Sequence, residues 1–215
     1  MSDITLRQNI LDELEFEPSI DAANIGVAVD GGVVTLTGHV GSYAEKVAAE
    51  RVVLHVKGVR AVAQEIEVRY PGSKKTADDE IAKRALNIIA WDTTIPNDKI
   101  QVKVQNGRIT LSGEVKWNFE KIAAENAVRK LSGVVGVVNL ITVHPHVDAL
   151  NVKHRIEEAL KRNAEVDAGG ISVGVSGGKV TLEGKVRAWH EREVAEGAAW
   201  AAPGVTTVED RLTII

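Results

Sequence analysis

Two six-residue segments place aromatic side chains between basic ones: Lys116-Trp117-Asn118-Phe119-Glu120-Lys121 and Arg187-Ala188-Trp189-His190-Glu191-Arg192. This mixture suits contact with a membrane at the headgroup level, where aromatic rings lie in the interface and Lys or Arg meets phosphate. The sequence therefore predicts a lipid-binding or partner-binding site made of Lys116, Trp117, Phe119, Lys121, Arg187, Trp189 and Arg192. The same aromatics also fit a hydrophobic staple, in which a residue before a helix packs on the first turns of that helix.

Catalysis and metal binding find little support in the sequence. The chain has no Cys, which excludes disulfides and thiolate chemistry. No nucleophile elbow and no recurring pair of His and carboxylate occurs. His144, His146 and His154 are close in sequence, but no carboxylate or Cys joins them at the spacing of metal ligands. We therefore expect a protein that is not an enzyme and that needs neither a cofactor nor a metal.

Charge is spread unevenly along the chain. The net charge is −5 for residues 1–71, +3 for residues 72–147 and −2 for residues 148–215, which gives −4 for the whole chain. The middle part is thus the one suited to an anionic partner. Nucleic acid recognition usually requires a denser basic patch. We expect an anionic phospholipid or an envelope protein as partner, and no nucleic acid.

The N-terminal residues and the apolar runs bear on location. No apolar run approaches the roughly 20 residues of a membrane span, so we expect no transmembrane segment. Residues 1–18 are acidic and amphipathic and lack the basic and apolar regions of a signal peptide. As written, the sequence predicts a cytoplasmic protein. A periplasmic location would require that a native signal had been removed.

A block of 38 residues occurs three times without a gap, at residues 31–68, 106–143 and 177–214. Self-similarity at a fixed period indicates repeated structural units. We therefore predict three tandem domains, residues 1–71, 72–147 and 148–215, in place of the one or two that the length alone would suggest. Domains of roughly 70 residues are near the lower limit for a self-sufficient core.

Each copy has the pattern helix, strand, strand, helix, strand. In the first copy, apolar residues recur at helical spacing at the N-terminus, and strand-like alternation follows. A two-residue hairpin turn is predicted at Gly31-Gly32, Asn106-Gly107 and Gly177-Gly178. The pattern predicts an α+β fold of three two-layer domains, each a three-stranded mixed sheet with two helices on one face. The third strand should lie parallel to the second after a right-handed crossover.

Three positions recur in every copy, and we interpret them as structural. One is a strand glycine with the parity of buried residues, over which we expect a helix to pack: Gly38, Gly113 and Gly184. Another is the glycine expected to end the second helix at the C′ position: Gly58, Gly133 and Gly204. The last is an inward polar residue on the third strand, which must be hydrogen-bonded or lie at a bulge: Gln64, Asn139 and Asp210.

Two motifs recur around these positions. The second strand carries an aliphatic-x-Leu-x-Gly pattern, namely Val34-Leu36-Gly38, Ile109-Leu111-Gly113 and Val180-Leu182-Gly184. Each copy ends with a Gly-Val pair, two further residues and then a strand of alternating apolar residues, which contains the inward polar residue. Together with the hairpin glycine and an Ala-rich second helix, the pattern resembles the BON domain, the bacterial OsmY and nodulation family, over nearly the whole chain. Many members of that family are exported, whereas from the sequence as written we expect no export signal.

The resemblance implies a non-enzymatic module that associates with phospholipid membranes or envelope structures, often in connection with osmotic stress. Our leading hypothesis is a non-catalytic triple BON-domain protein that binds such surfaces. The alternative is a soluble scaffold, or a sensor of small ligands or ions, that uses grooves between domains. Trp91, at the end of the first helix in the second copy, is expected in the core or against a neighbouring domain.

Overall fold

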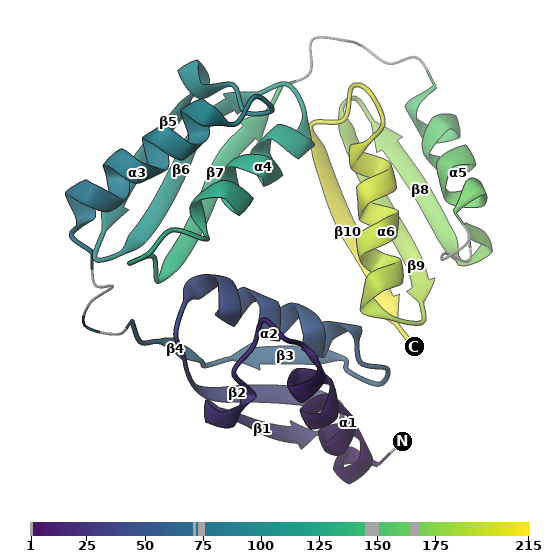
Figure 1. Ribbon diagram of the computed structural model, residues 1–215. Coiled ribbons are helices and arrows are strands. Elements are labelled where there is room, and N and C mark those ends of the chain that lie inside the picture. Colours follow the sequence, from purple (N-terminus) through teal and green to yellow (C-terminus); the bar gives the residue numbers. More distant parts are fainter. Residues whose placement is uncertain (1, 71, 73–75, 145–150, 164–167) are drawn as a thin grey trace. The chain divides into compact units, whose positions relative to one another are not determined.

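The computed structural model describes residues 2–70, 72, 76–144, 151–163 and 168–215. It contains three repeats in which two helices cover one face of a small sheet (Figure 1). The predicted α+β class and the order helix, strand, strand, helix, strand are confirmed in each repeat. A short 3-10 turn, which the sequence pattern did not indicate, precedes the first strand of each.

The elements follow the repeats closely. The first repeat consists of α1 (Asp3–Phe16), η1 (Ala22–Asn24), β1 (Ile25–Asp30), β2 (Val33–Val40), α2 (Tyr43–His55), β3 (Ala61–Gln64) and β4 (Glu67–Val68). The second consists of α3 (Asp78–Trp91), η3 (Asn97–Lys99), β5 (Ile100–Gln105), β6 (Arg108–Val115), α4 (Asn118–Val128) and β7 (Gly136–Val143). The third consists of α5 (Val152–Arg162), η4 (Ala168–Gly170), β8 (Ile171–Ser176), β9 (Lys179–Val186), α6 (Trp189–Trp200) and β10 (Thr207–Ile214).

Every sheet has its second strand in the centre. The strand orders are β1-β2-β3, with β4 also on β2, then β5-β6-β7 and β8-β9-β10. β1 is antiparallel to β2, whereas β3 and β4 are parallel to it, and β10 is parallel to β9. The hairpin and the helical crossover account for these directions, because a two-residue turn reverses the chain and a crossover helix restores its direction.

The core lies between the helices and one face of each sheet. In α1, the buried positions are Leu6, Ile10 and Leu14, a spacing of four that keeps them on one side of the helix. Ile4 is exposed, so the apolar stripe is narrower than the sequence pattern indicated. Ala49 on α2 is fully buried, and its small side chain allows the helix to approach the sheet closely. Ala124 and Ala195 occupy the same place in the other repeats and are equally buried.

The hairpin turns of the first and second repeats are fixed by positive φ angles and by an acidic residue from the first helix. Asn106 and Gly107 have φ of 51° and 73°, the region that such a turn requires at both central residues. The two carboxylate oxygens of Asp78 accept the backbone N–H groups of Asn106 and Gly107, at 2.7 and 2.8 Å. Asp3 accepts the N–H of Gly31 in the same way, at 3.0 Å. The start of the first helix is thereby tied to the hairpin.

The strand glycines are required by a backbone other than that of a helix, which corrects our expectation. Gly38 has φ of +103°, and a Cβ there would collide with the carbonyl oxygen of Asn24 at the end of η1. Gly184 has φ of +138°, and its Cβ would collide with the carbonyl of Gly170 in η4. Gly113 also has a positive φ, 132°. The backbone that approaches each glycine in the first and third repeats is thus the 3-10 turn before the first strand.

The glycines after the second helix are also displaced from their expected place. Gly58 lies beyond the end of α2, as the third residue of a β-turn in which the N–H of Val59 donates to the carbonyl of Val56 at 3.2 Å. Its φ of 98° is typical of that position in a type II turn, which favours glycine. Gly133 and Gly204 occupy equivalent turns, with φ of 90° and 92°. They reverse the chain toward the third strand and do not cap the helix.

The inward polar residues are hydrogen-bonded, and in the third repeat the strand that carries one shows no bulge. Gln64 Oε1 accepts the N–H of Ile66 at 3.1 Å, and Asp210 Oδ1 accepts that of Leu212 at 2.8 Å. Asn139 Nδ2 donates to Glu125 on α4 at 3.1 Å. The pairing of β10 with β9 keeps one register throughout, from Thr207 opposite Lys179 to Ile214 opposite Val186. Gln64 and Asp210 thus bind the backbone of their own strand, and Asn139 binds the helix that covers it.

Candidate functional site

The aromatic–basic segment of the second repeat, residues 116–121, lies where β6 ends and α4 begins. Glu120 in the first turn of α4 accepts the backbone N–H groups of Lys116 and Trp117, at 2.8 and 3.0 Å. Its carboxylate therefore holds the two residues that precede the helix, besides suiting the helix dipole. The backbone that carries Lys116 and Trp117 is fixed, so their side chains project from a rigid support.

The apolar side chains of this segment are exposed. Trp117 is 37% exposed and Phe119 is 56% exposed, and Ile122 one turn further on is also exposed. The Lys116 side chain is exposed as well. A staple uses the residue that precedes the helix, which here is Trp117, and the greater part of the Trp117 side chain is covered, as a staple would require. Phe119, inside the first turn of α4, retains more than half of its surface for contact with another molecule.

Lys121 differs from the exposed Lys116 in its surroundings. In the other two repeats, the residue at the position of Lys121 contacts the third strand or a residue next to it. Lys46, its counterpart in α2, donates to the carbonyl of Ile66 at 2.6 Å. Arg192, its counterpart in α6, pairs with Asp210 on β10. Lys121 is itself engaged in a polar interaction. For Lys46 and Arg192 the polar partners thus lie on or next to the third strand.

The corresponding segment of the third repeat, residues 187–192, is occupied by contacts within the repeat. The guanidinium of Arg192 lies over the Trp189 ring, 4.9 Å from its centroid, which is a cation–π arrangement. The Nε group of Arg187 donates to Glu191 at 3.0 Å, and Glu191 is buried. Both cations predicted for this part of the site are therefore paired inside the domain. The structure brings the predicted residues together as two separate sets, one exposed and one internally satisfied.

Trp91, which was expected in the core or against a neighbouring domain, is exposed on the second repeat. Its side chain is 87% exposed at the end of α3, so it takes no part in the core. The buried positions of α3 are Ile81, Ala85 and Ile89, spaced by four, and Trp91 lies off that stripe. The phase of the helix was the signal that could have identified it.

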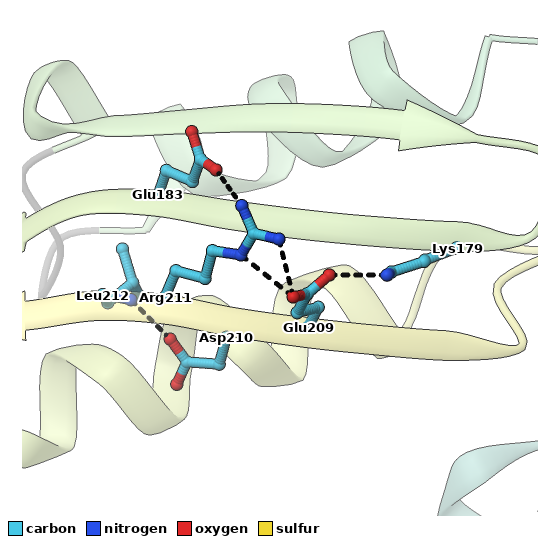
Figure 2. A network of polar contacts seen from close by, with 6 residues as sticks. All are labelled: Lys179, Glu183, Glu209, Asp210, Arg211 and Leu212. Atoms are coloured by element: carbon cyan, nitrogen blue, oxygen red, sulfur yellow. Dashed lines mark hydrogen bonds and ion pairs between the residues drawn. The ribbon is translucent and has the colours of Figure 1, made fainter.

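A second surface is the open face of each sheet, which we define as the face not covered by the helices. In the third repeat this face carries a chain of ion pairs (Figure 2). Glu209 binds Lys179 at 2.6 Å and Arg211 at 2.8 Å, and Arg211 also binds Glu183 at 2.9 Å. Hydrogen bonds from Lys179 and Arg211 lower the pKa of Glu209 below its ordinary value.

The described residues contain neither a membrane-spanning helix nor a metal-binding cluster. Within those ranges, no helix combines the length and the apolar character needed to cross a bilayer. Over the same residues, no cluster of three or more His, Cys, Asp or Glu side chains could hold a metal ion. His146, which the sequence analysis considered as a ligand, lies outside the described residues.

Comparison with known proteins gives one family and several relatives. A family model described as "BON domain" matches residues 2–70, 77–145 and 148–215. The chain is 28% identical over 148 residues to osmotically-inducible protein Y of Escherichia coli strain K12, covering 65% of this chain and 71% of that protein.

Two solved structures give weaker likenesses. The C-terminal domain of CdsD, the structural protein of the type III secretion system of Chlamydia trachomatis, is 14% identical with a TM-score of 0.28, covering 100% of both chains. The periplasmic domain of PrgH is 10% identical with a TM-score of 0.23, covering 95% of this chain and 99% of that one. We draw no argument from similarities of this size.

Proposed function

This chain belongs to the BON domain family, and from that premise we propose that it is a non-catalytic protein of three BON domains, residues 1–71, 72–147 and 148–215, that binds anionic phospholipid surfaces. The similarity to osmotically-inducible protein Y supports a role at the cell envelope during osmotic stress. The observation that carries the lipid proposal is the exposed aromatic–basic segment at the start of α4.

The proposed contact lies at one end of the second repeat. Trp117 and Phe119 would enter the interfacial region, and Lys116 would meet lipid phosphates. Aromatic residues favour the headgroup level because one part of the ring system is apolar while the indole N–H can remain hydrated.

Charge favours the second repeat over the other two. It has a net charge of +3, whereas the first and third repeats carry −5 and −2. Each basic residue near an anionic surface contributes about 1 kcal/mol of attraction, which salt screens. The third repeat has the same kinds of residue in its segment, but its Arg187 and Arg192 are already paired with Glu191 and Asp210. Lipid phosphate would have to displace those carboxylates.

Co-sedimentation with vesicles tests this proposal. The full chain is mixed with vesicles of phosphatidylcholine alone, or of phosphatidylcholine with phosphatidylglycerol, at low and high salt. We expect binding to the anionic vesicles at low salt only. The double variant Trp117→Ala/Phe119→Ala should weaken binding by at least about tenfold, because burial of a full aromatic side chain contributes about 1.5–3 kcal/mol.

The matched control is Phe16→Ala, which removes a more exposed aromatic residue from the acidic first repeat. This variant should bind as the unchanged chain does. Absence of binding to anionic vesicles at low salt would refute the lipid proposal. Equal losses in the control and in the double variant would refute its assignment to the start of α4.

A further inference from the structure

The open faces of the first and second repeats differ in charge and in side-chain size at equivalent positions. On the first repeat this face carries the acidic residues Asp30 and Glu65, together with Glu67, which pairs with Arg69 at 2.8 Å. On the second repeat it carries the basic residues Lys103 and Arg108, which are both exposed. Within the described residues, neither of these two basic side chains takes part in an ion pair.

The apolar residues of the two faces differ in a corresponding way. β7 presents Val138 and Leu140, which are 37% and 59% exposed. The first repeat has Ala63 and Glu65 at the same two positions, and Ala28 and Ala61 lie nearby on the same face. One face therefore projects two aliphatic side chains, while the other is flat and built from small residues with acidic groups at its margin.

We propose that these two faces bind each other between two copies of this chain, with the open face of the first repeat of one copy on the open face of the second repeat of the next. Opposite charges on the two faces favour this pairing over the pairing of like faces, which would bring acid to acid or base to base. The face of the third repeat is excluded, because Lys179, Glu183, Glu209 and Arg211 already satisfy one another there (Figure 2).

This association is heterologous, since the two surfaces are different. An assembly of any length then has one unused face of each kind, one at each of its two ends. Further copies can add there, or the two ends can bind each other, so the product is an open chain or a ring. The exposed charges make the association sensitive to salt, because charges at a surface are screened over about 10 Å at 0.1 M ionic strength. The surface is distinct from the start of α4, so this inference does not depend on lipid binding.

Sedimentation or light scattering at low salt gives the first test. We expect the average mass to rise with concentration above the 23.1 kDa of one chain, and to return to it at high salt. Val138→Ala/Leu140→Glu places the first repeat's own residues on β7 and should weaken association at least about tenfold. The control Thr207→Glu adds the same negative charge to β10 and should leave association unchanged.

A mixing experiment identifies the two faces. Glu65→Lys/Glu67→Lys makes both faces of one variant basic, and Lys103→Glu/Arg108→Glu makes both faces of the other acidic. Each variant alone should remain at 23.1 kDa, and their equimolar mixture should associate, because the basic face of one meets the acidic face of the other. Recovery in the mixture also shows that both variants are folded.

Three results would overturn the proposal. The first is a mass of one chain at all concentrations at low salt. Another is association that Val138→Ala/Leu140→Glu leaves unchanged. The last is a mixture of the two charge-reversed variants that stays at the mass of one chain, which would point to pairing of like faces or to another surface.

Discussion

Replacing Gly184 by Ala tests the packing of the 3-10 turn on the central strand. Gly184 has φ of +138°, and a Cβ would collide with the backbone carbonyl of Gly170. Gly177 in the hairpin also has a positive φ, +58°, but a Cβ there would meet nothing within 4 Å. The two glycines therefore separate the cost of backbone strain from the cost of collision.

The magnitudes follow from this difference. Gly177→Ala should lower the stability of the third repeat by about 1–2 kcal/mol, the cost of a non-glycine residue in the left-handed region. Gly184→Ala adds the displacement of a fixed backbone segment, so we expect about 3–5 kcal/mol. Because native domains are stable by only about 5–15 kcal/mol, and small ones lie at the low end, Gly184→Ala should leave the third repeat close to unfolding.

The assay must read each repeat separately, because three small domains need not unfold as one. Hydrogen exchange of the full chain, followed by mass spectrometry of peptides from β2, β6 and β9, provides this resolution. Protection should fall sharply in β9 with Gly184→Ala and remain unchanged in β2 and β6. If Gly177→Ala and Gly184→Ala lowered protection equally, the close approach of η4 to β9 would not be the reason for the glycine.

The remaining predictions concern polar contacts. Asp78→Asn keeps one acceptor for the hairpin in place of two, and urea unfolding should show a loss of about 1–2 kcal/mol in the second repeat; no loss would mean that the hairpin needs no support from α3. Arg192→Ala removes the cation over Trp189 and should change tryptophan emission, whereas the conservative Arg192→Lys should retain part of the native signal; identical spectra would contradict the stacking. Thr94→Val removes a hydroxyl hydrogen bond to Asp92, which now lowers the pKa of that carboxyl, so NMR titration should show this pKa rising toward its ordinary value. A carboxyl with a lowered pKa stabilises the fold at pH values above its ordinary pKa of about 4, and this stabilisation is lost as pH falls through the folded pKa. Thr94→Val should therefore lessen the loss of stability in acid. An unchanged Asp92 pKa in the variant would contradict this account.

Much of the fold could be predicted because the three copies agree at the positions that decide it. The hairpin glycines and the alternating strands repeat in register, and local backbone preference is sufficient to interpret them. The sequence predicted that another segment approaches the strand glycine, but not which segment it is. Gly38 contacts Asn24, which lies in a 3-10 turn that leaves no apolar period in the sequence.

The candidate site could be predicted only as a collection of residue types. Residues 116–121 and 187–192 look alike in sequence, yet Phe119 is exposed while Trp189 lies under Arg192. In the third repeat Arg192 lies over Trp189 and pairs with Asp210, whereas the second repeat has Asn118 in place of that ring and Asn139 in place of that acid. The partners of the basic residue on the second helix thus come from the start of that helix and from the third strand.

The sequence by itself determined the number of repeats, the order of their elements and the fold of each, because periodicity and turn residues act locally along the chain. Only the tertiary structure decided which side chains are available for binding. Availability depends on what a side chain meets across the sheet or beneath the helix, and those partners are distant in sequence. Trp91 shows this most directly, because the sequence left a place in the core open for it and its side chain is 87% exposed.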